Sequence, residues 1–524
     1  MQLQRRGRAV FSTIIVLGSS VLLFSVVDKH TKSTAPDQSE HIQQIETDTV
    51  ELPGSAGSAP LRLSLEQLMH AYNVPGISIA LIDDYQIVWA KGYGVVEPGS
   101  DKQVTTRTLY QAGSISKPVA ATGALALVEQ GKLSLDEDVN KKLTSWKVPE
   151  NNFTTTEKVT LRRIMSHTAG LTVHGFPGYD VDESLPTLIQ IFNGEKPANT
   201  PPIRVDFQPG SMSRYSGGGV TIEQQLMMDV TGKPFPALMR ELVLDKIGMS
   251  DSSYEQPLPP KRAAMTAGGA GMDGSEIHGR WHIYPEMAAA GLWTTPTDLA
   301  KFGIEIALSK QGKSNRVLSQ KMVNEMLTPA PKAKENEGLG FFLDRNTPGQ
   351  FSHGGSDAGF QALFTMNADT GKGAVIMADS DNGNALEGVL LHKIAQEYGW
   401  TYKPPREESW DHLYLIALVK GTPAALREYD DLKGQTSPDY KVDENTLNVF
   451  GYFLLNSAKP TDAVEVFKRN VEEYPKSWNV YDSLGEAYMK TGQKDPAIQN
   501  YEKSLEINPN NSNAAEHLKK LKGQ

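Results

Sequence analysis

Ser114 and Lys117 are the residues of this chain whose types and spacing most clearly could do chemistry. They stand three positions apart in Gly113-Ser114-Ile115-Ser116-Lys117, so a helix would place them on one face. A lysine amine can there accept the serine hydroxyl proton, which turns a weak nucleophile into one that attacks a carbonyl carbon. A plainer interpretation also fits, in which Ser114 caps a helix and Lys117 lies on its surface.

The segment after Ser114 suggests a second property of this residue. Residues 119–130 are predicted to be a helix that ends at Gly131, a residue type that favours the left-handed conformation after a helix. Pro118 is tolerated only in the first turn, so Ser114 would lie at or near the helix N-terminus. The backbone N–H of Ser114 would then be unpaired, in a place where the helix dipole favours negative charge. It is a candidate oxyanion donor.

Two later segments could complete such a site. Tyr215 stands just before three glycines, 217–219, and its hydroxyl could exchange a proton with the serine or the leaving group. A core tyrosine before a flexible loop is the other interpretation. In His353-Gly354-Gly355-Ser356, paired glycines on an edge strand would admit a substrate backbone, and the N–H of Ser356 would be a second oxyanion donor.

Other chemical signals are weaker. The segment 354–358 comes close to the nucleophile elbow of α/β-hydrolases, but it ends in alanine and a predicted strand follows where that fold needs a helix. Four further histidines lack the spacing of metal ligands and are interpreted as structural. They are His167, His174, His278 and His282. The sequence predicts no metal site and no cofactor.

Composition narrows the classes of function. The chain has 524 residues, enough for two or three domains, and its 39 % hydrophobic and 22 % charged residues are ordinary for a globular protein. A net charge of -10 argues against nucleic acid as the main partner. The sequence contains no cysteine, which excludes disulfides, thiolate catalysis and cysteine-type zinc sites.

The N-terminus predicts export. Arginines precede an uncharged run, 9–27, that is long enough to span a bilayer. No small-residue cleavage site follows directly, so 1–27 is predicted to be an uncleaved membrane anchor in preference to a cleaved signal. The rest of the chain would lie on the periplasmic or extracytoplasmic side. Residues 28–60, which are polar and rich in Gly and Pro, are predicted to be a flexible linker.

Residues 61–400 are predicted to be an α+β domain. The expected elements are a helix at 61–72 and strands at 77–82, 86–91, 360–366 and 374–378. These strands make two hairpins, and mostly helical and loop segments separate them. A sheet built from both ends of a domain around a helical insert is typical of the α+β class and not of alternating βαβ units.

The last region, 406–524, has only helical patterning. Units 444–477 and 478–511 align at five spaced positions, and their length matches the tetratricopeptide (TPR) period of about 34 residues. Residues 513–521 would be a capping helix, and 410–432 a degenerate preceding unit. Helical repeats without catalytic groups are usually interaction surfaces, so the array is predicted to bind a protein partner or to pack on the preceding domain.

Taken together, these motifs make 61–400 resemble the serine β-lactamase and penicillin-binding protein superfamily. The most similar branch holds class C β-lactamases, D-alanyl-D-alanine carboxypeptidases, D-amino-acid peptidases and related esterases. Residues 161–171 are similar to the family's L-L-x-H-T-S-G-L segment, and 289–299 to its A-G-G-L-x-S-T-x-x-D-L segment. The fold implied is an antiparallel sheet flanked by helices, with a helical subdomain and the site between them.

The resemblance implies a role for each site residue. Ser114 would be the acylated nucleophile and Lys117 its base partner. Tyr215 would pass the proton to the leaving group and activate water for deacylation. His353 would take the place of the K-T-G lysine, and the N–H groups of Ser114 and Ser356 would form the oxyanion hole.

Two positions depart from the family pattern. Gly217 stands where the family's Y-x-N motif has asparagine, and His353 is a cation only when protonated. Both changes weaken the case for binding a substrate carboxylate.

The expected function is an exported serine hydrolase that forms an acyl-enzyme with a small ester or a peptide, including peptides that contain D-amino acids or derive from peptidoglycan. One alternative is a β-lactamase or a penicillin-binding D,D-carboxypeptidase. Another is a non-catalytic cell-envelope scaffold whose TPR array carries the function. The intact set of Ser114, Lys117 and Tyr215 favours an enzyme over the scaffold.

Overall fold

The computed structural model describes residues 38–52, 60–332, 336–401, 409–434 and 442–523. The membrane anchor predicted at 1–27 lies outside these residues. Within the described ranges, every helix is too short or too polar to cross a bilayer.

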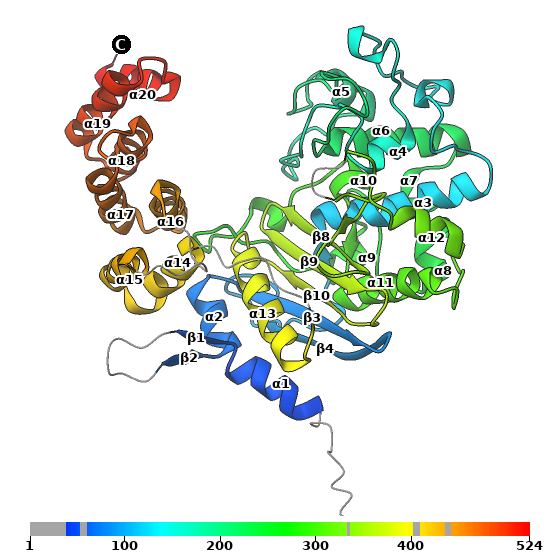
Figure 1. Cartoon of the computed structure of the whole chain (residues 1–524), viewed down its shortest axis with the longest axis horizontal. Coiled ribbons are helices and arrows are strands. Elements are labelled where there is room, and N and C mark those ends of the chain that lie inside the picture. Colours follow the sequence, from blue (N-terminus) through cyan, green and yellow to red (C-terminus); the bar gives the residue numbers. More distant parts are fainter. Residues whose placement is uncertain (1–37, 53–59, 333–335, 402–408, 435–441, 524) are drawn as a thin grey trace, which may run out of the picture.

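A six-stranded antiparallel sheet, in the order β4-β3-β10-β9-β8-β7, forms the centre of the larger domain (Figure 1). The strands are β3 (Gly76–Asp83), β4 (Gln86–Gly94), β7 (Phe342–Leu343), β8 (Gln350–Asp357), β9 (Phe360–Asn367) and β10 (Gly373–Ala378). Because Ile79 of β3 lies opposite Ile376 of β10, the two hairpins predicted from the sequence join at the centre of one sheet. The α+β class is therefore confirmed.

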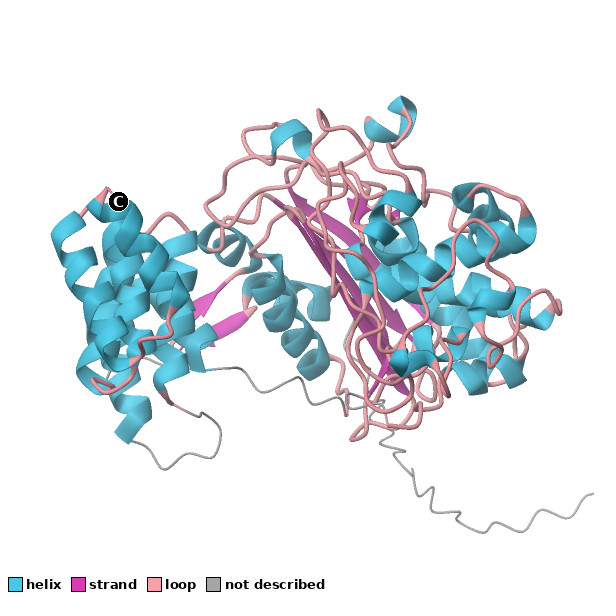
Figure 2. Ribbon diagram, turned by 90° about the horizontal axis from the view of Figure 1, so that it is seen from above, coloured by secondary structure: helices cyan, strands magenta, loops and turns pink. Residues whose placement is uncertain are grey.

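Helices cover both faces of this sheet, as Figure 2 shows. On one side lie α3 (Ser116–Glu129) and α11 (Pro296–Lys310), and on the other α2 (Leu65–Ala71) and α13 (Gly383–Glu397). The strand alternation decides which residue joins which layer: Ala80 and Ile82 enter the first core, whereas Ile79 and Leu81 enter the second. Burial of both faces of β3 thus accounts for its hydrophobic run, which only Ser78 interrupts.

The insert between β4 and β7 builds the helical subdomain beside the sheet. Its elements are β5 (Tyr110–Gln111), the 3₁₀ turn η1 (Gly113–Ile115), α3, α4 (Leu161–Met165), α5 (Leu188–Asn193), α6 (Gly217–Thr231), α7 (Phe235–Met239), α8 (Asp245–Ile247), α9 (Pro260–Ala263), α10 (Met287–Ala290), β6 (Trp293–Thr294), α11 and α12 (Gln320–Met326). The helix α6 packs against α10, α3 and α4. The subdomain and the sheet meet along η1 and β8.

The segment predicted to be a flexible linker, 28–60, is ordered in its described part. There α1 (Gln38–Thr47) packs on α13, and β1 (Val50–Leu52) pairs with β2 (Leu61–Leu63). Ile45 and Leu52 are buried in these contacts. The prediction of a linker was wrong for 38–52, because a few apolar residues in a polar segment are enough to dock it on an existing core.

The same pairing shortens the helix predicted at 61–72. Residues 61–63 form the strand β2, and α2 begins only at Leu65. Ser64 and Gln67 make a capping box, in which each side chain bonds the other residue's backbone N–H. The helix therefore starts after Ser64, although the apolar spacing alone extends to Leu61.

The C-terminal region is a curved stack of helices that extends away from the sheet (Figure 1). These are α14 (Ser409–Lys420), α15 (Thr422–Gly434), α16 (Glu444–Asn456), α17 (Pro460–Glu473), α18 (Trp478–Lys490), α19 (Lys494–Ile507) and α20 (Ser512–Lys522). A Cβ on Gly451 would lie 2.6 Å from the Phe467 ring, and one on Gly485 would lie 3.1 Å from the Tyr501 ring. Small residues at these crossings let the two helices of each repeat pack closely, which explains the residue pattern that the two units share.

The stack packs on the larger domain through its first helices. The ring centroid of Tyr414 in α14 lies 5.9 Å from that of Tyr72, directly after α2, and 5.3 Å from that of Phe453 in α16. One cluster of buried residues continues from the outer face of β3 through α2 and α13 into α14 and α16. The TPR array therefore shares a core with the sheet, in agreement with the expectation that it packs on the preceding domain.

Candidate active site

Ser114 lies in η1, which runs directly into α3. The Nζ of Lys117, one helical turn on, donates a hydrogen bond to Ser114 Oγ over 2.7 Å. Lys117 is 3 % exposed, and its amine also donates to the carbonyl oxygen of Ala289 over 2.8 Å. The carbonyl fixes the amine against the hydroxyl, so a neutral amine at the same place would accept the hydroxyl proton. The surface-lysine interpretation is excluded by this burial.

Ser116 anchors the start of α3, where the nucleophile must be held. Its carbonyl accepts a hydrogen bond of 2.7 Å from the buried hydroxyl of Tyr254. Its side-chain oxygen accepts a second bond, of 2.9 Å, from the backbone N–H of Leu292. The first turn of α3 is thus fixed from two directions, and Ser114 and Lys117 on either side of Ser116 share that rigidity.

Tyr215 lies against Lys117 and among three histidines. The amine of Lys117 is 4.9 Å from the centroid of the Tyr215 ring. The ring centroids of His167, His174 and His353 are 4.3, 4.9 and 6.2 Å from that of Tyr215. The structure therefore brings together the three predicted catalytic residues, and the proton-relay role of Tyr215 stays a prediction.

Sequence reasoning placed His167 and His174 outside the site. They line Tyr215 because the loop after α4 folds back over the start of α6. The buried Nδ1 of His167 accepts a hydrogen bond of 3.2 Å from the N–H of Ser216, so this nitrogen carries no proton. Burial, reinforced by Lys117, lowers the pKa of His167 well below its usual value. No spacing rule could have revealed this contact, and within the described residues no group of metal-ligating side chains forms.

The glycines at 217–219 allow the first turn of α6 to touch the loop that precedes it. A Cβ on Gly217 would lie 3.0 Å from the carbonyl oxygen of His174 and 3.1 Å from the Phe176 ring. A Cβ on Gly218 would lie 2.7 Å from the carbonyl oxygen of Thr172. Gly217 therefore leaves no room for the asparagine of the family's motif unless the loop shifts.

The strand β8 runs along η1 with backbone against backbone. A Cβ on Gly113 would lie 2.4 Å from the backbone nitrogen of Ser356, and one on Gly355 would lie 2.0 Å from the carbonyl oxygen of Ala112. Glycine is needed at both positions for this approach. The two segments that contain the predicted oxyanion donors are therefore neighbours, and the oxyanion role of Ser114 and Ser356 stays a prediction.

His353 faces the site from β8 and is 3 % exposed. Its Nδ1 lies 2.6 Å from the carbonyl oxygen of Gly354, and its ring centroid is 5.1 Å from that of Phe342. Burial lowers the pKa of His353 to about 3, and the nearby Lys117 acts in the same direction. The residue at the K-T-G lysine position is therefore an uncharged imidazole near neutral pH.

Two buried carboxyl groups lie behind the site, and sequence reasoning missed both. Burial raises the pKa of Asp357 well above its usual value, although Lys117, the N–H of Gly113 and the hydroxyl of Tyr284 oppose that effect. Burial likewise raises the pKa of Glu286, directly before α10, to about 8. Isolated acidic residues carry no sequence signal of burial, because tertiary packing alone decides it.

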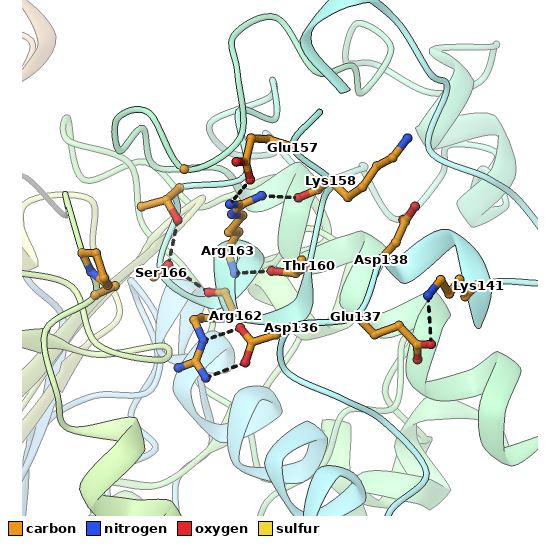
Figure 3. A pocket seen from close by; sticks show the side chains of 14 residues that line it. Asp136, Glu137, Asp138, Lys141, Glu157, Lys158, Thr160, Arg162, Arg163 and Ser166 are labelled. Atoms are coloured by element: carbon orange, nitrogen blue, oxygen red, sulfur yellow. Dashed lines mark hydrogen bonds and ion pairs between the residues drawn. The ribbon is translucent and has the colours of Figure 1, made fainter. Parts of the chain in front are cut away.

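A large hollow of about 590 Å³ lies elsewhere, beside α4 (Figure 3). It contains none of the predicted site residues. Arg162 binds both oxygens of Asp136, and Arg163 pairs with Glu157, as the dashed lines in Figure 3 mark. Its arginines are thus already paired within the protein, which is typical of a solvated surface.

Comparison with known families decides the identity of the larger domain. The family model described as Beta-lactamase matches residues 61–398, and a tetratricopeptide repeat model matches 483–511. The chain belongs to the β-lactamase family. Its resemblance to that family therefore extends over most of the chain and includes every residue assigned to the site.

Relatives within this family differ in function. A β-lactamase of Pseudomonas fluorescens is 27 % identical over 194 residues, which cover 37 % of this chain and 50 % of that protein. Esterase EstB of Burkholderia gladioli is 24 % identical over 234 residues, covering 40 % and 55 %. The chain thus spans about half the length of these two relatives. An octameric penicillin-binding protein homologue from Pyrococcus abyssi has the same fold, with a TM-score of 0.54, 23 % identity and coverage of 64 % and 77 %.

Proposed function

We propose that this protein is a serine hydrolase that forms an acyl-enzyme on Ser114 and acts on a small ester or a peptide. The observation that carries the proposal is the 2.7 Å contact between Lys117 Nζ and Ser114 Oγ. It occurs at the start of a rigidly held helix and beside the glycine-rich strand β8. Membership of the β-lactamase family supports the same chemistry.

Acylation would begin with the neutral amine of Lys117 taking the proton of Ser114 Oγ. The oxygen then attacks the substrate carbonyl carbon, and the N–H groups of Ser114 and Ser356 stabilise the resulting oxyanion. As the bond to the leaving group breaks, the Lys117 proton passes through the Tyr215 hydroxyl to that group. The leaving group departs with its proton, and the acyl group stays on Ser114.

Deacylation would reverse the proton path. A water molecule gives its proton to the Tyr215 and Lys117 pair, and its oxygen attacks the ester carbonyl of the acyl-enzyme. The bond from Ser114 Oγ to the acyl carbon breaks, the serine regains its proton, and the acid product leaves. The bond from Lys117 to the carbonyl of Ala289 keeps the amine in place through both halves of the cycle.

The setting of this activity rests on the sequence. The arginine-flanked apolar run in 1–27 supports export, with the hydrolase held at the extracytoplasmic side of a membrane. The TPR array, which leaves most of its surface away from the sheet (Figure 1), supports a protein partner for its outer repeats. β-Lactam hydrolysis is the second candidate function, favoured by the 27 % identity to the Pseudomonas fluorescens β-lactamase.

Intact-mass spectrometry tests the proposal. A fragment that starts at residue 38, so that α1 and β1 are retained, is mixed with p-nitrophenyl acetate or with a penicillin and quenched at short times. With p-nitrophenyl acetate, we expect the acetyl mass on the wild type and no adduct on Ser114→Ala. Undiminished p-nitrophenol release by Ser114→Ala, after subtraction of the spontaneous rate, would contradict the mechanism. Consumption of the penicillin by the wild type and not by Ser114→Ala would favour the second candidate.

A further inference from the structure

His353, whose ring centroid lies 6.2 Å from that of Tyr215, offers a hydrogen-bond acceptor instead of a positive charge. Its Nδ1 lies 2.6 Å from the carbonyl oxygen of Gly354, and a carbonyl oxygen only accepts, so the ring proton sits on Nδ1. The remaining nitrogen, Nε2, then carries a lone pair. A carboxylate is itself an acceptor, so it would be repelled by that lone pair, whereas a neutral group that donates a hydrogen bond would be accommodated.

The two basic side chains next to Tyr215 already have hydrogen-bond partners within the protein. Lys117 donates to Ser114 Oγ and to the carbonyl oxygen of Ala289. The guanidinium of Arg214, directly before Tyr215, bonds both oxygens of Asp206, at 2.5 and 3.0 Å, and the carbonyl oxygen of Leu171. A substrate carboxylate could recruit either cation only by breaking bonds that hold the nucleophile or the Tyr215 loop in place.

Gly354 leaves open space next to His353. A Cβ built there would have one neighbour, the carbonyl oxygen of Ala362 at 3.9 Å. The residue is exposed on β8, and its backbone is outside the left-handed region. Packing therefore does not require glycine at 354, in contrast to Gly355. The position contributes no hydroxyl that could bind an anion, and it leaves room for a substrate group.

From this geometry we propose that the leaving group binds beside His353 and Gly354, and that this side of the site selects substrates without a free carboxylate, namely neutral esters and amides, including internal positions of a peptide. The inference rests on the proposed hydrolysis at Ser114 and adds its substrate class. A peptide cut before its last residue, or a β-lactam with its ring carboxylate, would place an anion beside His353 and be disfavoured.

Two thioesters with the same acyl group test this selection. One has thioglycolate as its leaving group, with a free carboxylate, and the other has the N-methylamide of thioglycolate. Thiol release reports cleavage of the same bond in both. We expect kcat/KM for the thioester with the N-methylamide leaving group to exceed that for the thioester with the carboxylate leaving group by about tenfold or more. This is the effect of one unfavourable polar contact.

The outcomes separate the two proposals. Equal rates, or a preference for the carboxylate, with hydrolysis that is lost in Ser114→Ala, would overturn the substrate class and leave the acyl-enzyme mechanism standing. Hydrolysis of neither probe would overturn the proposed hydrolysis and this inference with it.

Variants of His353 sharpen the test. In His353→Lys an ammonium replaces the acceptor, so the carboxylate probe should gain about tenfold relative to the amide probe. The control His353→Gln is neutral and should change this preference much less than His353→Lys does, because its amide can bind a carboxylate only through an uncharged donor. Gly354→Thr provides a second variant, because it fills open space on β8 and adds a hydroxyl. It should raise kcat/KM for the carboxylate probe relative to the amide probe. A ratio that stays fixed in both His353→Lys and Gly354→Thr would overturn the proposal.

The pH dependence gives a readout that needs no variant. Lys117, His167 and Tyr215 face His353, and Asp357 lies further along the same strand. Because burial and Lys117 lower the pKa of His353 to about 3, the imidazole stays uncharged between pH 8 and pH 5. The ratio of kcat/KM between the two probes should therefore change by less than about twofold over that range. A rise in carboxylate turnover as pH falls through about 6.5, the ordinary value for histidine, would contradict the inference.

Discussion

The catalytic domain and the TPR array hold their key residues together in opposite ways. In the array, most contacts join helices that follow one another in sequence, as Gly451 meets Phe467 in the next helix. In the site, Ser114, Tyr215 and His353 come from three distant segments that meet only when the insert and the sheet are both in place. The array is thus built repeat by repeat, whereas the site depends on the fold of the whole domain.

The largest expected effect distinguishes a variant in the active site from a variant in the array. Lys117→Ala removes the base that contacts Ser114 Oγ, so the acylation rate should fall about 1,000-fold, within the range measured for general-base catalysis. Pre-steady-state release of p-nitrophenol measures that rate. The matched control is Lys503→Ala, which breaks only an exposed pair with Glu506 in the array and should acylate normally. A normal acylation rate in Lys117→Ala would assign the base to another residue.

A second pair of variants asks where the two regions join. Tyr414→Ala opens a cavity in the core that α14 shares with the sheet, and should lower the free energy of unfolding of the catalytic domain by about 3 kcal/mol. Tyr501→Ala makes a similar cavity in the last repeat and should destabilise only the end of the array. Thermal inactivation of the hydrolase gives the readout. If Tyr414→Ala inactivates at the wild-type temperature, the array is attached without stabilising the domain.

A third comparison concerns the close approach of β8 to η1. In Gly355→Ala the new Cβ would lie 2.0 Å from the carbonyl oxygen of Ala112, so the strand must move away from Ser114. We expect kcat/KM to fall about 100-fold, the loss typical of a shift of about 1 Å in a catalytic group. Gly388→Ala is the control, because a Cβ there meets nothing within 4 Å. Wild-type activity in Gly355→Ala would show that the spacing of β8 is not critical.

The smallest effect, taken per pH unit, tests the buried acids of the catalytic domain against the exposed acids of the array. Burial raises the pKa of Glu286 from 4.5 to about 8, so between these values the folded protein holds a proton that the unfolded chain has lost. Stability then falls as pH rises through that window, by up to about 1.4 kcal/mol per pH unit.

Glu286→Gln should flatten this dependence, and Glu506→Gln, an exposed acid in α19, should leave it unchanged. Urea midpoints at pH 5, 6.5 and 8 provide the measurement. Identical slopes in the wild type and Glu286→Gln would mean that Glu286 is ionised in the folded state.

The sequence predicted regular elements well where one local pattern decides them. The strand patterns at 77–82 and 360–366 and the repeat at 444–511 each depend on neighbours along the chain, so the hairpins and the TPR helices could be predicted. The chemical pair of Ser114 and Lys117 was found because both lie on a single helical turn.

Features that depend on distant contacts escaped prediction. The docking of Ile45 and Leu52, the burial of Glu286 and the tilted packing of His167 against Tyr215 all need partners from other segments. The glycines at 217–219 were expected to allow a close approach, but only the structure shows that the neighbour is the loop at 172–176.

The pairing of β3 with β10 constrains the order in which this chain can fold. Strands β3 and β4 leave the ribosome early, yet β3 finds its second neighbour only after residues 373–378 have been made. Until then, one edge of the first hairpin stays open, and both of its faces lack part of their cover. Completion of the sheet must therefore await nearly the whole domain, and the outer core is completed only after α14 and α16 have been made. Ribosome-bound chains that end within the insert should remain sensitive to protease and depend on chaperones.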